Sequence, residues 1–289
     1  MLYRVRLTPK SEICATGVAV GRQQKNLRYV LVNTSGWQTT EKSIIKKENE
    51  HSPRQCRFSF FLIWRDMQYD NQIKLQSAVK AVIKEYENYK KNLMGKSMLV
   101  IYRNRTTMQL DHIIINFTGN NYYHLTGLAY KEDNGESTKN KHFASRFHND
   151  LEDKKLSFSD LKIKDNNTAL KIKALPFISS QYRYCNMTGN FNESGIKLQL
   201  DKVVGNTSTC LGLKHISGKN YVPASSLYGD TRKYAQITHQ IVAILIKETN
   251  DTDKYKTIKY VAKGHDLKNL TYNDELKKLF SLEQYKSAK

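Results

Sequence analysis

The sequence predicts an α+β fold in which N-terminal helices pack on an antiparallel β-sheet, all within a single compact domain. Two observations lead to this prediction. Apolar residues recur at helical spacing over residues 68–93, whereas the segments after residue 196 are short, apolar and separated by turns such as Gly205-Asn206. Helical patterns that precede strand patterns along a chain are typical of the α+β class. At 289 residues the chain is also long enough to bury a hydrophobic core.

The composition of the chain changes abruptly near Met67. Residues 1–66 contain 7 Arg and 5 Lys, whereas residues 67–289 contain 5 Arg and 30 Lys. The first segment is either a flexible basic arm that contacts nucleic acid or upstream sequence that precedes a true start at Met67. The reversal in basic-residue usage favours the second interpretation. We therefore expect an irregular or mis-annotated extension over residues 1–66 and the folded domain over residues 67–289.

The first helix is expected over residues 68–93, because its apolar residues alternate between spacings of four and three. Gly95 ends this helix. Residues 98–102 and 111–117 follow as two strands joined by a turn at Asn104-Arg105. The apolar stripe of the helix consists of Leu75, Val79, Val82, Tyr86, Tyr89 and Leu93.

The segment 122–128, Tyr-Tyr-His-Leu-Thr-Gly-Leu, carries the strongest indication of a functional site. As a strand, it would place His124 and Thr126 on one face and Leu125 on the other, because side chains alternate along a strand. The apolar face would then anchor the core, while the opposite face offers an imidazole and a hydroxyl to a ligand. Gly127 allows close approach of the backbone.

The remaining elements follow from the same patterns. A helix is predicted where apolar residues recur at a spacing of four, at Phe143, Phe147 and Leu151. The next helix begins at Thr168, is perturbed by Pro176, and is expected to bury Leu170, Ala174 and Ile178. Strands are predicted over 196–204, 209–216, 220–222, 240–247 and 256–262, and a last helix over 274–285.

The chain is strongly basic, with a formal net charge of +20 and an isoelectric point near 9.6. Such an excess favours an anionic polymer as the partner, because Lys and Arg side chains displace counterions from phosphates. The alternative is a lysine-rich composition that only keeps the protein soluble. The 35 basic and 22 acidic residues of 67–289 still leave a charge of +13. No basic amphipathic helix or lipidation motif indicates a membrane as the partner.

Cysteine usage and hydropathy indicate a reducing compartment. The four cysteines are widely spaced and include no CxxC pair, which argues against a zinc ribbon and against a disulfide framework. The longest apolar run, residues 58–64, is too short to span a bilayer, and no signal peptide is recognisable. We therefore expect a cytoplasmic protein.

The common catalytic motifs are missing. The sequence contains no HExxH, GxSxG, GxxxxGK[ST] or complete GxGxxG, so the zinc protease, α/β-hydrolase, P-loop and Rossmann classes lack their signatures. Asp201 and Asp230 do not form a pattern typical of a two-metal nuclease. We expect neither a metal nor an organic cofactor.

An ordered set of motifs over residues 70–265 resembles a known family. The motifs are Phe117, Tyr123-His124-Leu125-Thr126-Gly127-Leu128, Phe143, Lys171-Ile172-Lys173-Ala174-Leu175, Asp201-Lys202-Val203-Val204-Gly205, Cys210-Leu211-Gly212-Leu213, Tyr221-Val222-Pro223, Tyr255 and Ile258. This succession resembles the fourth family of phage-type nucleases in the barnase, EndoU, colicin and RelE superfamily, found on phages and mobile elements of low-GC Gram-positive bacteria. The resemblance implies a small helical layer on an antiparallel sheet, metal-independent RNA cleavage, and a domain that begins with the helix after Met67.

Metal-independent RNA cleavage needs a base for the 2′-hydroxyl, an acid for the leaving oxygen, and cations for the phosphorane. Histidine suits either proton role, and Lys stabilises developing negative charge. The catalytic candidates are His124 as base or acid, Thr126 as an orienting hydroxyl, Lys173 as a cation and His239 as a second proton-transfer group. The nucleic-acid-binding candidates are Lys171, Lys202, Tyr221, Lys247 and Tyr255.

Each candidate also has a purely structural interpretation. His124 would be a half-buried histidine bonded to backbone, the lysines a solvated surface, and Tyr221 a packing residue at a strand end. The other histidines have no neighbours in sequence that raise them above surface residues. They are His112, His142, His148, His215 and His265.

Three functions remain open at this point. The first is an endoribonuclease of a phage or mobile element that cleaves tRNA or other host RNA as a toxin or in conflict between elements, with a cognate immunity or antitoxin protein as a further partner. The second is a catalytically inactive nucleic-acid-binding module of the same fold. The third is a basic interaction protein that blocks an acidic host factor.

Overall fold

The computed structural model describes residues 16–18, 28–30, 74–133, 137–192, 198–283 and 285. The chain divides into two units, Met1–Arg65 and Asp66–Lys289. In the first unit, β1 (Thr16–Val18) pairs antiparallel with β2 (Arg28–Val30). The rest of the predicted extension lies outside the described residues.

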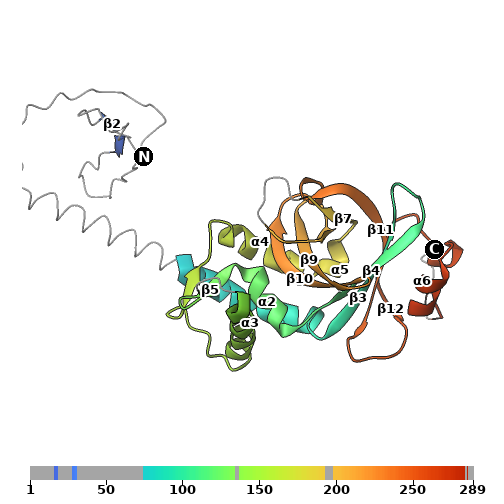
Figure 1. Cartoon of the computed structure of the whole chain (residues 1–289), viewed down its shortest axis with the longest axis horizontal. Coiled ribbons are helices and arrows are strands. Elements are labelled where there is room, and N and C mark those ends of the chain that lie inside the picture. The colour runs from blue at the N-terminus through green and yellow to red at the C-terminus, as the bar shows by residue number, and fades with distance from the viewer. Residues whose placement is uncertain are drawn as a thin grey trace, which may run out of the picture. The chain divides into compact units, whose positions relative to one another are not determined.

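Seven strands of the second unit close into a mixed β-barrel (Figure 1). Around the barrel the order is β11-β3-β4-β10-β9-β8-β7, and β7 pairs back onto β11. The pairs are antiparallel except for β10 and β4, which are parallel. The strands are β3 (Lys96–Arg103), β4 (Leu110–Asn116), β7 (Met187–Phe191), β8 (Lys202–Gly205), β9 (Thr209–Ser217), β10 (Asn220–Tyr228) and β11 (Ala235–Glu248).

The barrel corrects the predicted architecture. The α+β class is right, but helices packed on an open antiparallel sheet are wrong. The physical reason is the length of β11, which spans 14 residues. Its first part pairs with β7 and the part from Gln240 onward pairs with β3, so one strand joins both edges of the sheet. Hydrophobic patterns reveal strand segments but do not reveal which edges meet.

The helices α2 (Gly119–Thr126), α3 (Ser137–Glu152) and α4 (Thr168–Ile178) lie together on one side of the barrel (Figure 1). The predicted first helix is present over the described residues 74–92 and leads directly into β3. Its stripe packs with the helices and with the inner faces of the barrel strands in one core. The other helices are α2, α3, α4 and α5 (Gln181–Tyr184), and a two-stranded sheet of β5 (Leu128–Tyr130) and β6 (Leu161–Ile163) connects them.

The C-terminal segment covers the outer face of β3 and β11. Leu267, Leu276 and Phe280 are buried there against Leu99 and Leu245. The elements of this region are β12 (Thr257–Val261), η2 (Leu267–Asn269) and α6 (Asp274–Leu279), whereas the short helix η1 (Thr231–Lys233) precedes β11. The last helix is therefore shorter than the predicted 274–285.

Segment 122–128 is not a strand, which corrects a second prediction. Residues 119–126 form α2, because the backbone N–H of Thr118 donates to Asn121 Oδ1 at 2.8 Å at the start of the helix. Gly127 ends it in the left-handed conformation, with φ of 71°. His124 and Thr126 consequently point to different sides, because residues two apart do not share a helix face.

Several boundaries also differ from the predicted ones. The sequence does not predict β7, and β10 extends well past residue 222. Of the expected strand 196–204, residues 202–204 lie in β8 and residues 198–201 are not in a strand, whereas residues 196–197 lie outside the described residues. Leu170 of α4 is 41% exposed rather than buried. The short strands escape prediction because they are fixed by pairing partners rather than by their own alternation.

Candidate functional site

Each of the seven barrel strands carries one polar or aromatic side chain at the barrel end away from α2, α3 and α4. Cross-strand registers place Tyr102 opposite Asp111, Tyr221 opposite His215, and Asn190 opposite Lys202, so the members of each pair share a face. That face is the inner one, because Tyr221 and the residues two positions from Tyr102, Asp111, Lys202 and His215 belong to the barrel core. Those neighbouring core residues are Val100, Ile113, Val204 and Leu213. We call this set the mouth ring: Tyr102, Asp111, Asn190, Lys202, His215, Tyr221 and His239.

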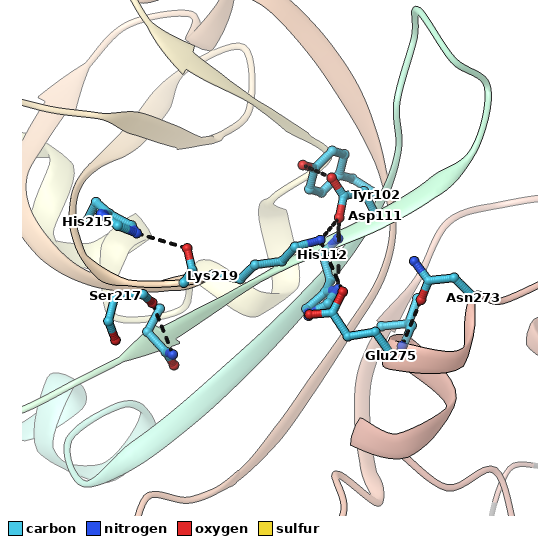
Figure 2. Close-up of polar contacts among 11 residues, drawn as sticks. Tyr102, Asp111, His112, His215, Ser217, Lys219, Asn273 and Glu275 are labelled. Atoms are coloured by element: carbon cyan, nitrogen blue, oxygen red, sulfur yellow. Dashed lines mark hydrogen bonds and ion pairs between the residues drawn. The ribbon is translucent and has the colours of Figure 1, made fainter.

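Asp111 is the anionic centre of the mouth ring. Its Oδ2 accepts the Tyr102 hydroxyl at 3.0 Å, and its Oδ1 accepts from the ammonium of Lys219. Figure 2 shows Lys219 reaching Asp111 from the turn between β9 and β10. Burial alone would raise the pKa of Asp111, but the bonds from Lys219, from the backbone of His112 and from Tyr102 lower it. Asp111 is therefore ionised at neutral pH.

His239 is held in its neutral form. Its ring stacks on Tyr102, with centroids 5.4 Å apart and planes 18° apart. Its Nδ1 accepts the backbone N–H of Arg105 at 3.1 Å, so the proton of the neutral ring lies on Nε2. Burial and the nearby charge of Lys202 lower the pKa of His239, and the charge of Asp111 offsets part of this decrease. The Nε2–H is thus a hydrogen-bond donor at neutral pH.

Lys202 carries an ammonium group of reduced basicity. Its Nζ donates to Asn190 Oδ1 at 2.6 Å and lies 6.0 Å from the centroid of the Tyr102 ring. Burial lowers the pKa of Lys202. The charge of Lys219 lowers this pKa further, whereas the charge of Asp111 raises it. A lysine in this environment releases its proton more readily than a solvated lysine, which suits it to proton donation.

His215 carries its proton on Nε2, like His239, but it is held through Nε2 rather than through Nδ1. Its Nε2 lies 2.9 Å from the carbonyl oxygen of Gly218 and therefore donates to it. In the neutral ring Nδ1 then holds an unprotonated lone pair. The ring contacts Tyr221 edge-on at 5.3 Å, and its backbone N–H donates to Asp201 at 2.7 Å. His215 is exposed at the rim of the barrel and is oriented like a general base.

Three pockets surround the first half of β11, next to the mouth ring. Their volumes are about 480, 590 and 210 Å³. His239 lines the second and the third, and Asn190 lines the third. Arginine is rare after residue 66, yet three of the five arginines there line these pockets: Arg103, Arg105 and Arg232. Arginine suits phosphate recognition because its guanidinium binds two oxygens at once.

The structure separates the predicted site residues into three groups. His239, Lys202 and Tyr221 come together in the mouth ring. His124 and Lys171 lie in the helical layer, on α2 and α4. Although the His124 ring is exposed, partial dehydration by the surrounding protein lowers its pKa, and the charges of Lys164 and Lys171 add to this.

Thr126 and Lys173 also lie in the helical layer but differ in exposure. Thr126 is fully buried, and its hydroxyl donates to the Tyr123 carbonyl at 2.9 Å and accepts the Leu128 N–H at 3.1 Å. These bonds close the C-terminal end of α2. Lys173 is exposed on α4.

Lys247 and Tyr255 form a third group, near the ends of β11 and β12. The Lys247 ammonium lies 4.9 Å from the Tyr255 ring centroid and donates to the carbonyls of Asp251 and Asp253. The buried Tyr255 hydroxyl bonds Ser97 Oγ at 2.6 Å. These contacts fix the 249–256 loop on the barrel wall.

Sequence reasoning missed Asp111, Tyr102, His215, Lys219 and the three pocket arginines. One signal was available, namely the rarity of arginine among the many lysines of residues 67–289. The others had no signal of their own. His239, for example, lies near the charge of Lys202 because β7 pairs back onto β11 and closes the barrel.

Two further findings describe the molecule more broadly. No helix among the described residues is long and apolar enough to cross a membrane. Within the same residues, no three His, Cys, Asp or Glu side chains gather as ligands for a metal ion.

Comparison with known proteins identifies one family. A family model described as phage-Barnase-EndoU-ColicinE5/D-RelE like nuclease4 matches residues 81–264. This confirms the resemblance seen in the motifs, and the matched range contains all seven barrel strands. No curated protein and no solved structure matches the chain.

Proposed function

Because the chain belongs to the phage-Barnase-EndoU-ColicinE5/D-RelE like nuclease4 family, we propose that it is a metal-independent endoribonuclease that reacts at the mouth ring. One observation carries this assignment. One end of the barrel carries two histidines that are held through different ring nitrogens, a lysine with a lowered pKa and an ionised aspartate. These are the groups that RNA cleavage through the 2′-hydroxyl requires.

His215 is the general base in this proposal. Its Nδ1 lone pair takes the proton of the 2′-hydroxyl, while Gly218 holds the Nε2–H and fixes the ring. The 2′-oxygen then attacks phosphorus and the bond to the 5′-oxygen breaks. The products are a 2′,3′-cyclic phosphate and a new 5′-hydroxyl, and no water is consumed in this step.

Lys202 and His239 act on the phosphate. Lys202 gives its proton to the leaving 5′-oxygen, a role suited to its lowered pKa. The His239 Nε2–H donates to a non-bridging oxygen, where charge develops in the transition state. Asp111 and Tyr102 position these groups, through the stacking of Tyr102 on His239 and the bond of Tyr102 to Asp111.

The proton-donating role of Lys202 predicts a pH dependence. Lys202 must be protonated, so the cleavage rate should fall as pH rises through its lowered pKa, below the usual 10.5. Lys202→Arg keeps the charge but cannot release a proton, so kcat should fall about 10²–10⁴-fold and the alkaline limb should disappear. The measurement is a pH–rate profile on an RNA oligonucleotide, corrected for uncatalysed hydrolysis. An unchanged alkaline limb in Lys202→Arg would assign the proton transfer to another group.

We also place the protein in the cytoplasm of the bacterial host of a phage or mobile element, where it acts as a toxin on tRNA or other host RNA. Its charge of +20 supports RNA as the substrate, and a self-toxic nuclease would need a cognate immunity protein. Induced expression should therefore arrest growth and fragment cellular RNA, whereas His215→Ala should do neither. Equal growth arrest by both proteins would indicate a non-catalytic block of a host factor.

A further inference from the structure

β11 changes its neighbour on one side near Gln240. Residues 235–240 pair with β7, whereas residues 243–246 pair with β12. β7 and β12 diverge at this point, and a pocket of about 590 Å³ opens between them and the β3–β4 hairpin. We call it the seam pocket. His239 lines both the seam pocket and the pocket at the barrel mouth, so the two are adjacent.

The lining of the seam pocket is cationic. Arg103, Arg105 and Lys263 contribute positive charge, and none of the described lining residues is acidic. Arg103 is tied to the Met108 carbonyl at 3.2 Å. The charged ends of Arg105 and Lys263 make no hydrogen bond or ion pair with other described residues, so both can contact a phosphate.

The seam pocket also offers groups that recognise a base. Tyr260 presents a half-buried ring, and Asn186 and Gln240 present side-chain amides. Neither amide makes a hydrogen bond within the part of the chain that the structure describes. An amide carries both donors and an acceptor, which match the edge of a nucleobase, and a tyrosine ring stacks on its face. The volume is in the range of small-molecule sites.

We infer that the seam pocket binds the nucleotide next to the scissile phosphate, with its base on Tyr260 and against Asn186 and Gln240. The inference rests on the proposed function, because it assumes that the RNA passes over His239 into the barrel mouth. The substrate class is single-stranded RNA, since a paired and stacked base could not enter the pocket. Arg105 and Lys263 hold the phosphate of the bound nucleotide.

Binding of an RNA that cannot be cleaved tests this inference. The probe is a set of fluorescent 2′-O-methyl oligonucleotides, identical except for one nucleotide, titrated into the full chain. The double variant Asn186→Ala with Gln240→Ala should raise Kd about tenfold for the preferred oligonucleotide. It should then bind all oligonucleotides of the set with the same Kd. Lys263→Ala should raise Kd for all of them. The matched control is Gln199→Ala, because Gln199 is an exposed amide outside the pocket lining.

The outcomes separate this inference from the proposed function. If 2′-O-methyl RNA binds with a base preference that the double variant removes, the seam pocket is the subsite even if no RNA is cleaved. If RNA is cleaved but Kd and base preference are the same in the double variant and in Gln199→Ala, the inference is overturned and the nuclease assignment stands.

Discussion

Replacing His215 by alanine should lower kcat for RNA cleavage about 10²–10⁴-fold, the usual contribution of a general base. The reason is that His215 alone in the mouth ring combines a fixed Nε2–H with a free Nδ1 lone pair. KM should change little, because the ring is proposed to act on the 2′-hydroxyl rather than to hold the RNA. The measurement is steady-state kinetics of the full chain on an oligonucleotide in EDTA.

Two other histidines make this experiment discriminating. His142 is exposed on α3 and takes no part in the proposed reaction, so His142→Ala is the matched control. His124, on α2, is the strongest candidate from sequence alone. If His124→Ala abolished cleavage while His215→Ala retained it, the reaction would take place in the helical layer, near Lys164 and Lys171, and not at the mouth ring.

Gly189→Ala should open the barrel and lower its stability by about 3 kcal/mol, the cost of forcing atoms into a well-packed interior. A Cβ on Gly189 would lie 2.3 Å from the Ile237 carbonyl oxygen and 2.9 Å from Ala235 Cβ. β7 pairs with β11 at this position, so the strands would have to move apart. The melting temperature should fall by roughly 6–12 °C, measured by circular dichroism or calorimetry.

Gly218→Ala is the control for the glycine change. Gly218 also lacks a Cβ but has no atom within 4 Å of where one would be, and its φ of 53° alone costs about 1–2 kcal/mol in a non-glycine residue. Gly189→Ala should therefore melt at a clearly lower temperature than Gly218→Ala. Equal melting temperatures would mean that the β7–β11 pairing does not close the barrel.

Local periodicity predicted the elements whose partners lie close in sequence. The stripe of the 74–92 helix, the β3–β4 hairpin and the β9 strand were all recovered, because their patterns reflect their own burial. The alternation of His124, Leu125 and Thr126 fits a period of two and so predicts a strand over segment 122–128, which is wrong. The cap at Thr118 and the glycine stop at Gly127 favour a helix instead.

Barrel closure could not be predicted from local patterns, and this limited what the sequence revealed about the site. The mouth ring takes one side chain from each of seven strands, and no two of its members are adjacent in sequence. Lys202 and Tyr221 are nevertheless predicted because of their chemistry and their place in the family motifs, and His239 because a histidine on a strand suits proton transfer. The sequence does not single out His215, because only its contact with Gly218 distinguishes it from a surface histidine.

The most direct test of the account is the chemistry of the cleaved ends. The full chain is incubated with single-stranded RNA in EDTA, and the products are analysed by mass spectrometry. The mouth ring predicts fragments that end in 2′,3′-cyclic phosphate with 5′-hydroxyl partners, formed at the same rate with and without the chelator. Fragments with 5′-phosphate and 3′-hydroxyl ends, or cleavage abolished by EDTA, would contradict attack by the 2′-hydroxyl at this site.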